Sequence, residues 1–282
     1  MIDINELHAV VTGAGAGIGR ATAIALAGRG ASVSCIDIDE RAADRTAEEI
    51  RATGRIASSH GADVSDSTAV ARVLENVRAQ HDRIDILINN AATFKVVGPV
   101  WEVDAGAWWS EVRTNLLGPF LMCQAVLPEM LRLGRGTIIN LSGGGFGGPV
   151  PGGTSYCCSK AGVIRLTDAL AGELRAVSGD SDNSVDGIRV FALEPPITNT
   201  AMNHYMATNP KGREWLPIVY QRLAEGSVEE PSAVGDAICD LIQVGDISLS
   251  GRLFPYNTDF SSLPDNEILN SDVYAMRYRL PV

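Results

Sequence analysis

A short apolar run that ends in a glycine-rich turn and leads into a helical pattern most restricts how this chain can fold. The run Leu7–Thr12 is followed by Gly13-Ala14-Gly15-Ala16-Gly17-Ile18-Gly19, and Arg20–Ala27 continues as a helix with a small, apolar face. Strand, glycine turn and helix in this order form the first unit of a dinucleotide-binding fold. Glycines let the backbone approach a pyrophosphate at the helix N-terminus, where free N–H groups and the helix dipole favour anions. No Gly-Lys-Ser/Thr follows, which excludes a P-loop.

A second apolar run, Ala31–Ile36, ends at Asp37, close to 20 residues after the glycine turn. An acidic side chain at this distance accepts hydrogen bonds from the adenosine ribose hydroxyls and repels a 2′-phosphate. No basic residue precedes Gly17 to attract such a phosphate. The pattern therefore favours NAD over NADP. The alternative is that Asp37 only caps a helix that begins near Asp39.

Tyr156 and Lys160 are the one Tyr-x-x-x-Lys pair in a chain with three lysines, the others being Lys95 and Lys211. On a helix this spacing puts both side chains on one face, one turn apart. An ammonium group beside a phenol stabilises the phenolate and lowers the tyrosine pKa by about 1–3 units. Such a shift brings a tyrosine within range of proton transfer at neutral pH. The alternative is an ordinary helical pair with a partly buried tyrosine.

Strand-like and helical patterns alternate down to about residue 195, which predicts a single α/β domain with a doubly wound parallel sheet. Residues 197–226 break this rhythm and are expected to form a helical substrate lid, and residues 256–282 a polar tail. A helix is expected over 104–134, with a possible irregularity at Gly118-Pro119. A further helix is expected over 231–244, and a last strand from Leu249 to Phe254. Residues 178–187 are polar and predict a surface loop.

Four segments resemble the short-chain dehydrogenase/reductase family, and the resemblance covers nearly the whole chain. They are Thr12-Gly13-x-x-x-Gly17-x-Gly19, similar to the cofactor loop; Asn89-Asn90-Ala91-Ala92, similar to the segment after the fourth strand; Asn115, similar to the helix asparagine; and Tyr156 with Lys160, similar to the catalytic pair. The resemblance implies a Rossmann-like fold and hydride transfer between NAD(H) and an alcohol or ketone.

The resemblance also implies roles for individual residues. The tyrosine is the general acid or base, the lysine lowers its pKa and holds the nicotinamide ribose, a serine hydrogen-bonds the substrate oxygen, and the asparagine positions a water in a proton relay. The implied catalytic residues are Tyr156, Lys160, Ser142 and Asn115. The implied cofactor-binding residues are Gly13, Gly17, Ile18, Gly19, Asp37, Asp63, Val64, Asn89, Ala91, Tyr156, Lys160, Thr198 and Thr200. Asp63 is expected to meet the adenine ring, or else to cap a helix at Ser65-Asp66.

Two positions depart from the family pattern. The family serine often lies thirteen residues before the tyrosine, where this chain has Gly143, so either the neighbouring Ser142 takes the role or the role is vacant or filled elsewhere. A missing donor to the substrate oxygen costs roughly 3–4 kcal/mol of transition-state stabilisation, by analogy with oxyanion-hole deletions. Pro195-Pro196 replaces the usual Pro-Gly, and Pro196 fixes its φ and lacks an N–H. This leaves either an altered nicotinamide placement or only a stiffened hinge.

Charge and residue usage exclude several classes of function. A net charge of −11 argues against an electrostatic grip on nucleic acid or an anionic membrane. No N-terminal stretch has the pattern of a signal peptide and no apolar run approaches the roughly 18 residues that span a bilayer, so a cytoplasmic protein is expected. Five cysteines without C-x-x-C spacing are expected to be free thiols. Four separated histidines predict no metal site: His8, His60, His81 and His204.

Large apolar side chains near the expected strand ends indicate a bulky, mostly apolar substrate, although each singly is more often core packing. They are Phe94, Phe146, Met202, Tyr205, Met206 and Trp215. The expected function is an NAD-dependent dehydrogenase of a secondary alcohol, or the matching ketone reductase. Alternatives are a cyclic-diol dehydrogenase, an epimerase-like relative, or an NAD-binding regulator with impaired catalysis. The resemblance implies a homo-oligomer, most simply a tetramer, joined through the helices around Phe120 and Val163.

Overall fold

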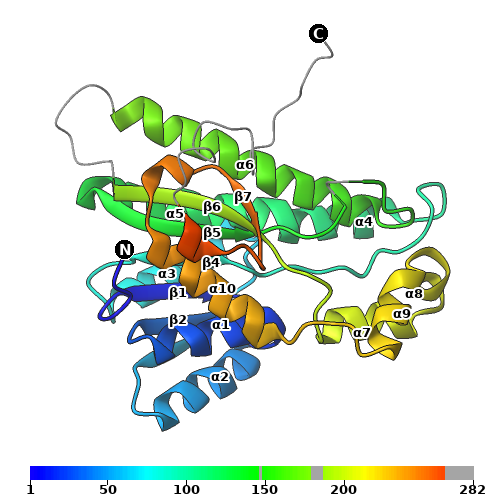
Figure 1. Cartoon of the computed structure of the whole chain (residues 1–282), viewed down its shortest axis with the longest axis horizontal. Helices are drawn as coiled ribbons and strands as arrows, with labels where there is room; N and C mark the ends of the chain where they lie inside the picture. The colour runs from blue at the N-terminus through cyan, green and yellow to red at the C-terminus, as the bar shows by residue number, and fades with distance from the viewer. Residues whose placement is uncertain (146–147, 179–186, 264–282) are drawn as a thin grey trace.

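A seven-stranded parallel sheet with the order β3-β2-β1-β4-β5-β6-β7 forms the centre of the molecule (Figure 1). The computed structural model describes residues 1–145, 148–178 and 187–263. The strands are β1 (His8–Thr12), β2 (Ser32–Asp37), β3 (Ala57–Gly61), β4 (Ile86–Asn89), β5 (Arg135–Leu141), β6 (Gly187–Glu194) and β7 (Leu253–Pro255). This sheet order confirms the predicted doubly wound, Rossmann-like fold.

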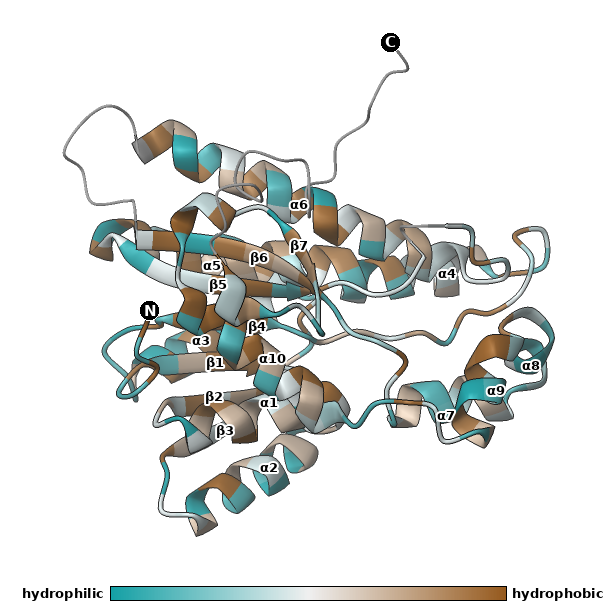
Figure 2. Cartoon of the chain, in the orientation of Figure 1, coloured by the Kyte–Doolittle hydropathy of each residue, from teal (hydrophilic) through white to brown (hydrophobic). Residues whose placement is uncertain are grey.

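Helices cover both faces of the sheet because each strand alternates its apolar side chains between two cores. On β1, Ala9 and Val11 belong to one core cluster and Val10 to the other. The first core is closed by α1 (Gly17–Gly28), α2 (Glu40–Ala52) and α10 (Pro231–Val244), and the second by α3 (Ser67–Arg78), α5 (Gly118–Leu133) and α6 (Thr154–Ser178). Figure 2 shows hydrophobic colouring concentrated on the strands and on the helix faces next to them.

The helix expected over 104–134 is present but interrupted. It consists of α4 (Ala105–Val112), a π-helical turn at Arg113–Leu117, and α5, so the irregularity lies directly before Gly118-Pro119. Asp104 caps α4 by accepting a hydrogen bond from the Ala107 N–H at 2.8 Å. By length and hydropathy the whole helix could cross a membrane. Its buried side chains, among them Met122 and Val126, pack in the second core cluster.

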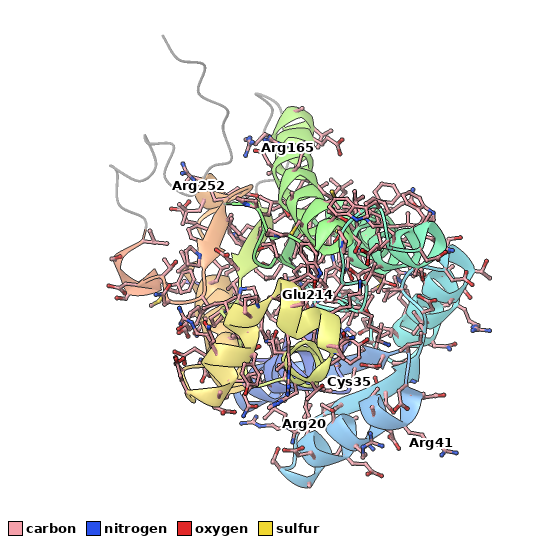
Figure 3. All side chains as sticks on the ribbon, turned by 90° about the vertical axis from the view of Figure 1, so that its right-hand side faces the viewer. Arg20, Cys35, Arg41, Arg165, Glu214 and Arg252 are labelled. Carbon is pink, nitrogen blue, oxygen red and sulfur yellow. The ribbon has the colours of Figure 1, made fainter. Side chains whose placement is uncertain are left out.

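The expected lid, residues 197–226, contains three short helices: α7 (Ala201–Thr208), α8 (Pro210–Trp215) and α9 (Pro217–Ala224). They share a small apolar cluster of their own around Met206, Leu216 and Val219. Figure 3 views the molecule from this side, with Glu214 labelled on α8 in front of the sheet. The lid helices therefore stand at the end of the sheet, beside the loops that leave the strands.

The C-terminal part differs in detail from the expectation. The last strand, expected from Leu249 to Phe254, is shorter, because a 3₁₀ turn at Ile247–Leu249 precedes β7. The tail is described as far as Leu263, where Phe260 and Leu263 pack into the first core cluster. The rest of the tail, and the polar loop expected over 178–187 from residue 179 to 186, lie outside the described residues.

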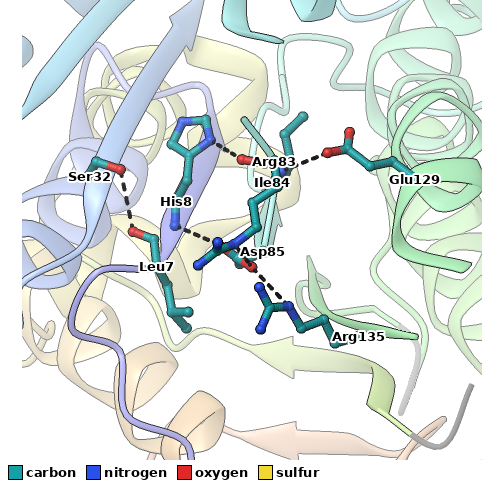
Figure 4. A network of polar contacts seen from close by, with 8 residues as sticks. All are labelled: Leu7, His8, Ser32, Arg83, Ile84, Asp85, Glu129 and Arg135. Atoms are coloured by element: carbon teal, nitrogen blue, oxygen red, sulfur yellow. Dashed lines mark hydrogen bonds and ion pairs between the residues drawn. The ribbon is translucent and has the colours of Figure 1, made fainter. Parts of the chain in front are cut away.

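An acidic side chain ties three strands together at the amino edge of the sheet (Figure 4). Asp85, buried just before β4, accepts a hydrogen bond from the His8 N–H at 3.0 Å and pairs with Arg83 at 2.8 Å and Arg135 at 3.7 Å. A buried carboxylate is costly unless it is paired and hydrogen-bonded, and here both conditions are met. This edge of the sheet is thus a structural region, opposite the edge at which the glycine turn lies.

Three of the four histidines, which are separated in sequence, form one polar network. The rings of His8 and His81 stack with centroids 3.7 Å apart, and the His8 ring nitrogen Nε2 lies 3.0 Å from Ser34 Oγ. Ser58 continues the chain of hydrogen bonds to His60. Burial lowers the pKa of His8 to about 4. Among the described residues no group of His, Cys, Asp or Glu could hold a metal ion.

Candidate active site

Tyr156 and Lys160 lie in the first two turns of α6, next to the carboxyl end of β5. The Lys160 ammonium lies 5.7 Å from the centroid of the Tyr156 ring and donates a hydrogen bond to the Leu141 carbonyl oxygen at 2.8 Å. Lys160 is buried and Tyr156 half-buried. The carbonyl of the last β5 residue therefore fixes the lysine head beneath the phenol, as the four-residue spacing predicted.

Burial dominates the electrostatics of this pair. It lowers the pKa of Lys160 to about 8. It also raises the pKa of Tyr156, and the nearby carboxylates of Glu111 and Glu194 and the Cys157 thiol act in the same direction. Sequence reasoning expected Lys160 to lower the Tyr156 pKa. The direction in this structure is the opposite, because the ring is withdrawn from water and acidic groups face it from α4 and β6.

Gly143, and not Ser142, faces the tyrosine hydroxyl. A Cβ added to Gly143 would lie 3.0 Å from Tyr156 Cζ and closer still to Oη. The Ser142 hydroxyl, which is buried, instead donates to the Leu193 carbonyl oxygen on β6 at 3.3 Å. The structure therefore does not bring Ser142 to Tyr156, and the position that corresponds to the family serine carries no side chain.

Asn115 lies in the π-helical turn and is fully buried. Its Oδ1 accepts a hydrogen bond from the Thr93 N–H at 2.8 Å, and its Nδ2 donates to the Thr93 carbonyl at 2.8 Å and to Ser159 Oγ at 3.3 Å. Ser159 immediately precedes Lys160. The asparagine thus connects the loop after β4 to the catalytic helix.

An aromatic ring covers one face of the tyrosine. Phe94, in the loop after β4, stacks on Tyr156 with ring centroids 4.3 Å apart and an interplanar angle of 11°. Gly153, just before α6, leaves room for this ring, since a Cβ there would lie 3.0 Å from Phe94 Cζ. Phe94 and Trp215 also pack against the apolar cluster of the lid. Of the other expected pocket residues, Met206 is buried in that cluster, Met202 is half-buried, Tyr205 is exposed, and Phe146 lies outside the described residues.

The glycine turn is shaped for close approach. Gly17 has a φ of +54°, which an L-side chain rarely adopts, and a Cβ there would lie 3.2 Å from Thr200 Cγ2 of the lid. Asn90 holds the turn from the other side, with Nδ2 donating to the Thr12 carbonyl at 2.9 Å and the Gly13 carbonyl at 3.2 Å. The sequence assigned no separate role to Asn90. Its side-chain amide links the motif after β4 to the glycine turn.

Asp37 lies beside the turn with both carboxylate oxygens engaged. They accept hydrogen bonds from the Gly15 N–H at 2.9 Å and the Asp39 N–H at 3.0 Å. The cap of α2 is Asp39, whose side chain accepts from the first-turn N–H groups of that helix. Asp37 therefore does more than cap a helix. Asp63 likewise accepts from the Ser65 N–H at 2.8 Å, while the cap of α3 is Asp66.

A cavity of about 480 Å³ extends from the glycine turn along the carboxyl edge of β2, β3 and β4. Five of the predicted cofactor residues line it: Gly13, Asp37, Asp63, Val64 and Ala91. A second hollow, of about 550 Å³, lies between α1 and the lid and is lined by Gly17 and Thr200. The first cavity joins the glycine turn to the end of β2, where an adenosine diphosphate group binds in such folds, so the residues that line it fit the adenosine half of a dinucleotide cofactor.

Three predicted cofactor residues lie elsewhere. The Asn89 side chain is buried in the sheet, where Nδ2 donates to Asn140 Oδ1 at 2.8 Å. Ile18 packs against the first core cluster. Thr198 is buried, and its carbonyl accepts a hydrogen bond from Asn203 at 2.8 Å. The buried side chains of Asn89 and Thr198 leave only their backbone for contact with a cofactor, whereas Ile18 is half-buried.

Sequence reasoning missed two acidic residues that face the tyrosine. Glu111 is buried on α4 and hydrogen-bonds the residue before Tyr156. Glu194 ends β6 two residues after Ala192, which contacts Ile164 of α6, so strand alternation places Glu194 on the same face of the sheet. Burial raises the Glu194 pKa. The available signal for Glu111 was a glutamate four residues before Asn115, on the same helix face as that asparagine.

Comparisons with known proteins identify the family of this chain. The sequence profile described as short chain dehydrogenase matches residues 7–211. D-threitol dehydrogenase of Mycolicibacterium smegmatis is 33% identical over 204 residues, which cover 72% of this chain and 75% of that one. The structure of NAD⁺-bound xylitol dehydrogenase is 25% identical, with a TM-score of 0.79 over 90% of this chain and 98% of that one. A metagenomic short-chain oxidoreductase in complex with NADP is 35% identical, with a TM-score of 0.63 over 69% and 84%. The chain therefore belongs to the short-chain dehydrogenase family.

Proposed function

We propose that this protein is an NAD(H)-dependent oxidoreductase of secondary alcohols and ketones in which Tyr156 is the general acid or base. The observation that carries the proposal is the Tyr156–Lys160 pair, with the half-buried phenol above the buried lysine at the carboxyl end of β5, beside a glycine turn and a cavity suited to a dinucleotide. The bound nicotinamide would accept or supply the hydride. The chain itself supplies position and proton transfer.

Each side chain then has a defined task. The Tyr156 hydroxyl gives a proton to the substrate oxygen during ketone reduction and takes one during alcohol oxidation. Lys160, with a pKa lowered to about 8, remains largely protonated at neutral pH and stabilises the phenolate. Asn115 holds the loop after β4 in place beside Ser159, and hence beside the lysine, where it would position the relay water.

Support for NAD over NADP comes from the residues at the end of β2. The Asp37 carboxylate faces the cavity, and Ile38, the next residue, also lines it. Neither could pair with a 2′-phosphate, and the carboxylate would repel one. Structures of relatives contain either cofactor, since the xylitol dehydrogenase was solved with NAD⁺ and the metagenomic oxidoreductase with NADP. The assignment to NAD therefore rests on Asp37.

The position of the family serine, which donates to the substrate oxygen, is occupied by Gly143 in this site. Of the possibilities left by the sequence, the geometry favours a vacant serine role, since Gly143 faces Tyr156 and the Ser142 hydroxyl is used by Leu193. For Ser142 to take the role, the loop after β5 would have to rearrange. The vacancy also keeps an NAD-binding regulator with weak catalysis as an alternative.

The substrate we propose is a bulky, mostly apolar secondary alcohol or ketone, because Phe94, Val150 and Trp215 pack together with the lid cluster beside the tyrosine. Glu194 favours a second candidate, a vicinal or cyclic diol. Its half-buried carboxyl group could hydrogen-bond the second hydroxyl. The D-threitol dehydrogenase relative acts on a polyol, as its name says, which is compatible with this candidate.

We also propose a cytoplasmic homo-oligomer, most simply a tetramer. Fewer apolar residues are available for an interface than the sequence indicated, because Val126, Val163 and Leu170 are buried in the monomer. What remains are three exposed apolar side chains on α4 and α5, Trp109, Phe120 and Leu131 at 57%, 43% and 38% exposure, which a second copy of the chain would cover.

Purified protein assayed for NADH and NADPH oxidation against a panel of cyclic and branched ketones, and for NAD⁺ reduction with diols, tests the proposal. Tyr156→Phe is the control, because it removes only the hydroxyl and should abolish turnover while NADH binding is kept. Retention by Tyr156→Phe of more than a few per cent of the wild-type rate would refute the role of the tyrosine. Binding of NADH without turnover of any panel member would favour the regulator.

A further inference from the structure

Two hydrogen bonds join α4 and the π-helical turn that follows it to the catalytic helix α6. Asn115 Nδ2 donates to Ser159 Oγ at 3.3 Å, and Ser155 Oγ donates to Glu111 Oε1 at 2.7 Å. Glu111 and Asn115 are four residues apart, as are Ser155 and Ser159, so each pair lies on one helix face. Ser155 immediately precedes Tyr156 and Ser159 immediately precedes Lys160. Glu111 therefore binds the residue before Tyr156, just as Asn115 binds the residue before Lys160.

The same two side chains also hold the backbone of the loop after β4. Asn115 binds both the N–H and the carbonyl of Thr93. Glu111 Oε2 accepts hydrogen bonds from the Lys95 N–H at 2.7 Å and the Val96 N–H at 3.1 Å. Phe94 lies between these anchored residues and stacks on Tyr156. The backbone is thus fixed on both sides of Phe94, which holds the Phe94 ring over the tyrosine.

Glu111 is 2% exposed, and its carboxylate oxygens accept three hydrogen bonds but pair with no cation among the described residues. A buried charge without a counter-ion is retained only where hydrogen bonds compensate for lost hydration. An apolar side chain here would leave the Lys95 and Val96 N–H groups and the Ser155 hydroxyl without this acceptor. The carboxylate is therefore explained by the loop and the helix turn that it binds, and by the negative charge that it brings near the tyrosine.

We propose that Glu111 is a positioning residue for the reaction: its carboxylate fixes the Phe94 loop and the first turn of α6 as one unit around Tyr156, and brings a negative charge to the side of the phenol that faces α4. This inference rests on the proposed function of Tyr156. Four charged or titratable groups face the phenol: Glu111 from α4, Glu194 from β6, and Cys157 and Lys160 from α6 itself. Of these, Glu111 is bonded both to the residue before the tyrosine and to the loop that covers it.

Two substitutions of Glu111 separate the effect of its hydrogen bonds from the effect of its charge. In Glu111→Gln the amide oxygen can still accept from Lys95 and Val96, and the amide nitrogen can donate to Ser155, since a hydroxyl accepts as well as donates. This variant keeps the contacts and removes the charge. Glu111→Ala removes both. Glu48→Gln, on the exposed face of α2, is the matched control for the loss of one carboxylate.

Three measurements are made on the full chain: the pH dependence of kcat/KM, the ultraviolet titration of the tyrosine against a Tyr156→Phe background, and amide hydrogen exchange at Lys95 and Val96. Glu111→Gln should keep the protection of both amides and move the Tyr156 titration and the matching limb of the pH profile to lower pH. Glu111→Ala should lose that protection and lower kcat by about tenfold or more, because the phenol is no longer held in place. Glu48→Gln should match the wild type.

A Glu111→Gln profile that superimposes on that of Glu48→Gln would overturn the role of the charge. Wild-type amide protection and kcat in Glu111→Ala would overturn the role in holding. If Glu111→Ala does not fold, Glu111→Gln still decides the first point, and Ser155→Ala, which removes the hydrogen bond between Glu111 and α6, decides the second: a wild-type kcat in this variant would overturn the role in holding. Absence of turnover with every substrate would refute the proposed function, whereas the tyrosine titration and the exchange data would still decide Glu111.

Discussion

Adding one methyl group at Gly143 tests the arrangement around Tyr156 most directly. A Cβ at this position would lie 3.0 Å from Tyr156 Cζ and closer still to the hydroxyl, whereas ordinary contacts begin at 3.4 Å. The glycine φ lies outside the left-handed region, so alanine would meet no backbone strain there. The whole effect of Gly143→Ala must therefore come from the contact with the phenol.

The size of the effect follows from how far the ring must retreat. To restore normal contact the hydroxyl has to move by roughly 1 Å, and Phe94 restricts the movement on one face. Overpacking of this kind costs about 1–3 kcal/mol of stability. A 1 Å misplacement of a catalytic group lowers the rate by about 10²-fold. We expect Gly143→Ala to lower kcat by about 10- to 100-fold.

Gly144→Ala is the matched control, because a Cβ at Gly144 meets nothing within 4 Å. It should leave kcat unchanged and, by reducing the freedom of the unfolded chain, stabilise the protein by up to about 1 kcal/mol. Steady-state kinetics and urea denaturation of both variants are the assays. Equal kcat values for the two variants would refute the placement of the phenol against Gly143. Gly143→Ser adds the family's hydroxyl to the same Cβ, so kcat above that of Gly143→Ala would show that the donor was vacant.

Four further outcomes are expected. Ser142→Ala should change kcat by less than about threefold if its hydroxyl serves only Leu193; a loss near 10²-fold would return the donor role to Ser142. Asp37→Ala should narrow the preference for NADH over NADPH measured by calorimetry, and equal affinities in the unmodified protein would contradict the NAD assignment. Burial holds the His8 pKa near 4, so the folded state resists a proton that the unfolded chain accepts below about 6.5; urea denaturation should show about 2 kcal/mol of stability lost between pH 7 and pH 5, and a smaller loss in His8→Gln. Sedimentation at micromolar concentration should give a multiple of the chain mass, and Phe120→Glu should reduce it; a stable single-chain species in the unmodified protein would contradict the oligomer.

Local patterns in the sequence were sufficient for most of the fold. Alternating apolar residues and the glycine turn predicted the parallel sheet, and the four-residue spacing predicted that Tyr156 and Lys160 share a helix face. These features depend on neighbours in the chain, which a sequence displays directly. The expected helix irregularity near Gly118-Pro119 was also found, although no pattern indicated that it would be a π-helical turn.

Contacts between distant segments could not be predicted in the same way. The Phe94 ring and the Glu111 carboxylate reach Tyr156 from other elements, and neither pairing follows from spacing. The expected lowering of the Tyr156 pKa considered Lys160 alone and omitted burial and the acidic groups on α4 and β6. Spacing also could not decide between Ser142 and Gly143, because that choice depends on how the chain leaves β5.

The π-helical turn at Arg113–Leu117 is the place where the 29-residue helix from Ala105 to Leu133 can best tolerate the loss of one residue. A π turn contains one residue more than an α turn, so it can lose that residue and close as regular helix while the parts on either side keep their faces. Elsewhere in the helix one residue added or removed would rotate one part against the other by about 100°. The stretch that can absorb such a change is the stretch that carries Asn115. A deletion that the fold tolerates would therefore displace Asn115 and disturb its hydrogen bond to Ser159 on the catalytic helix.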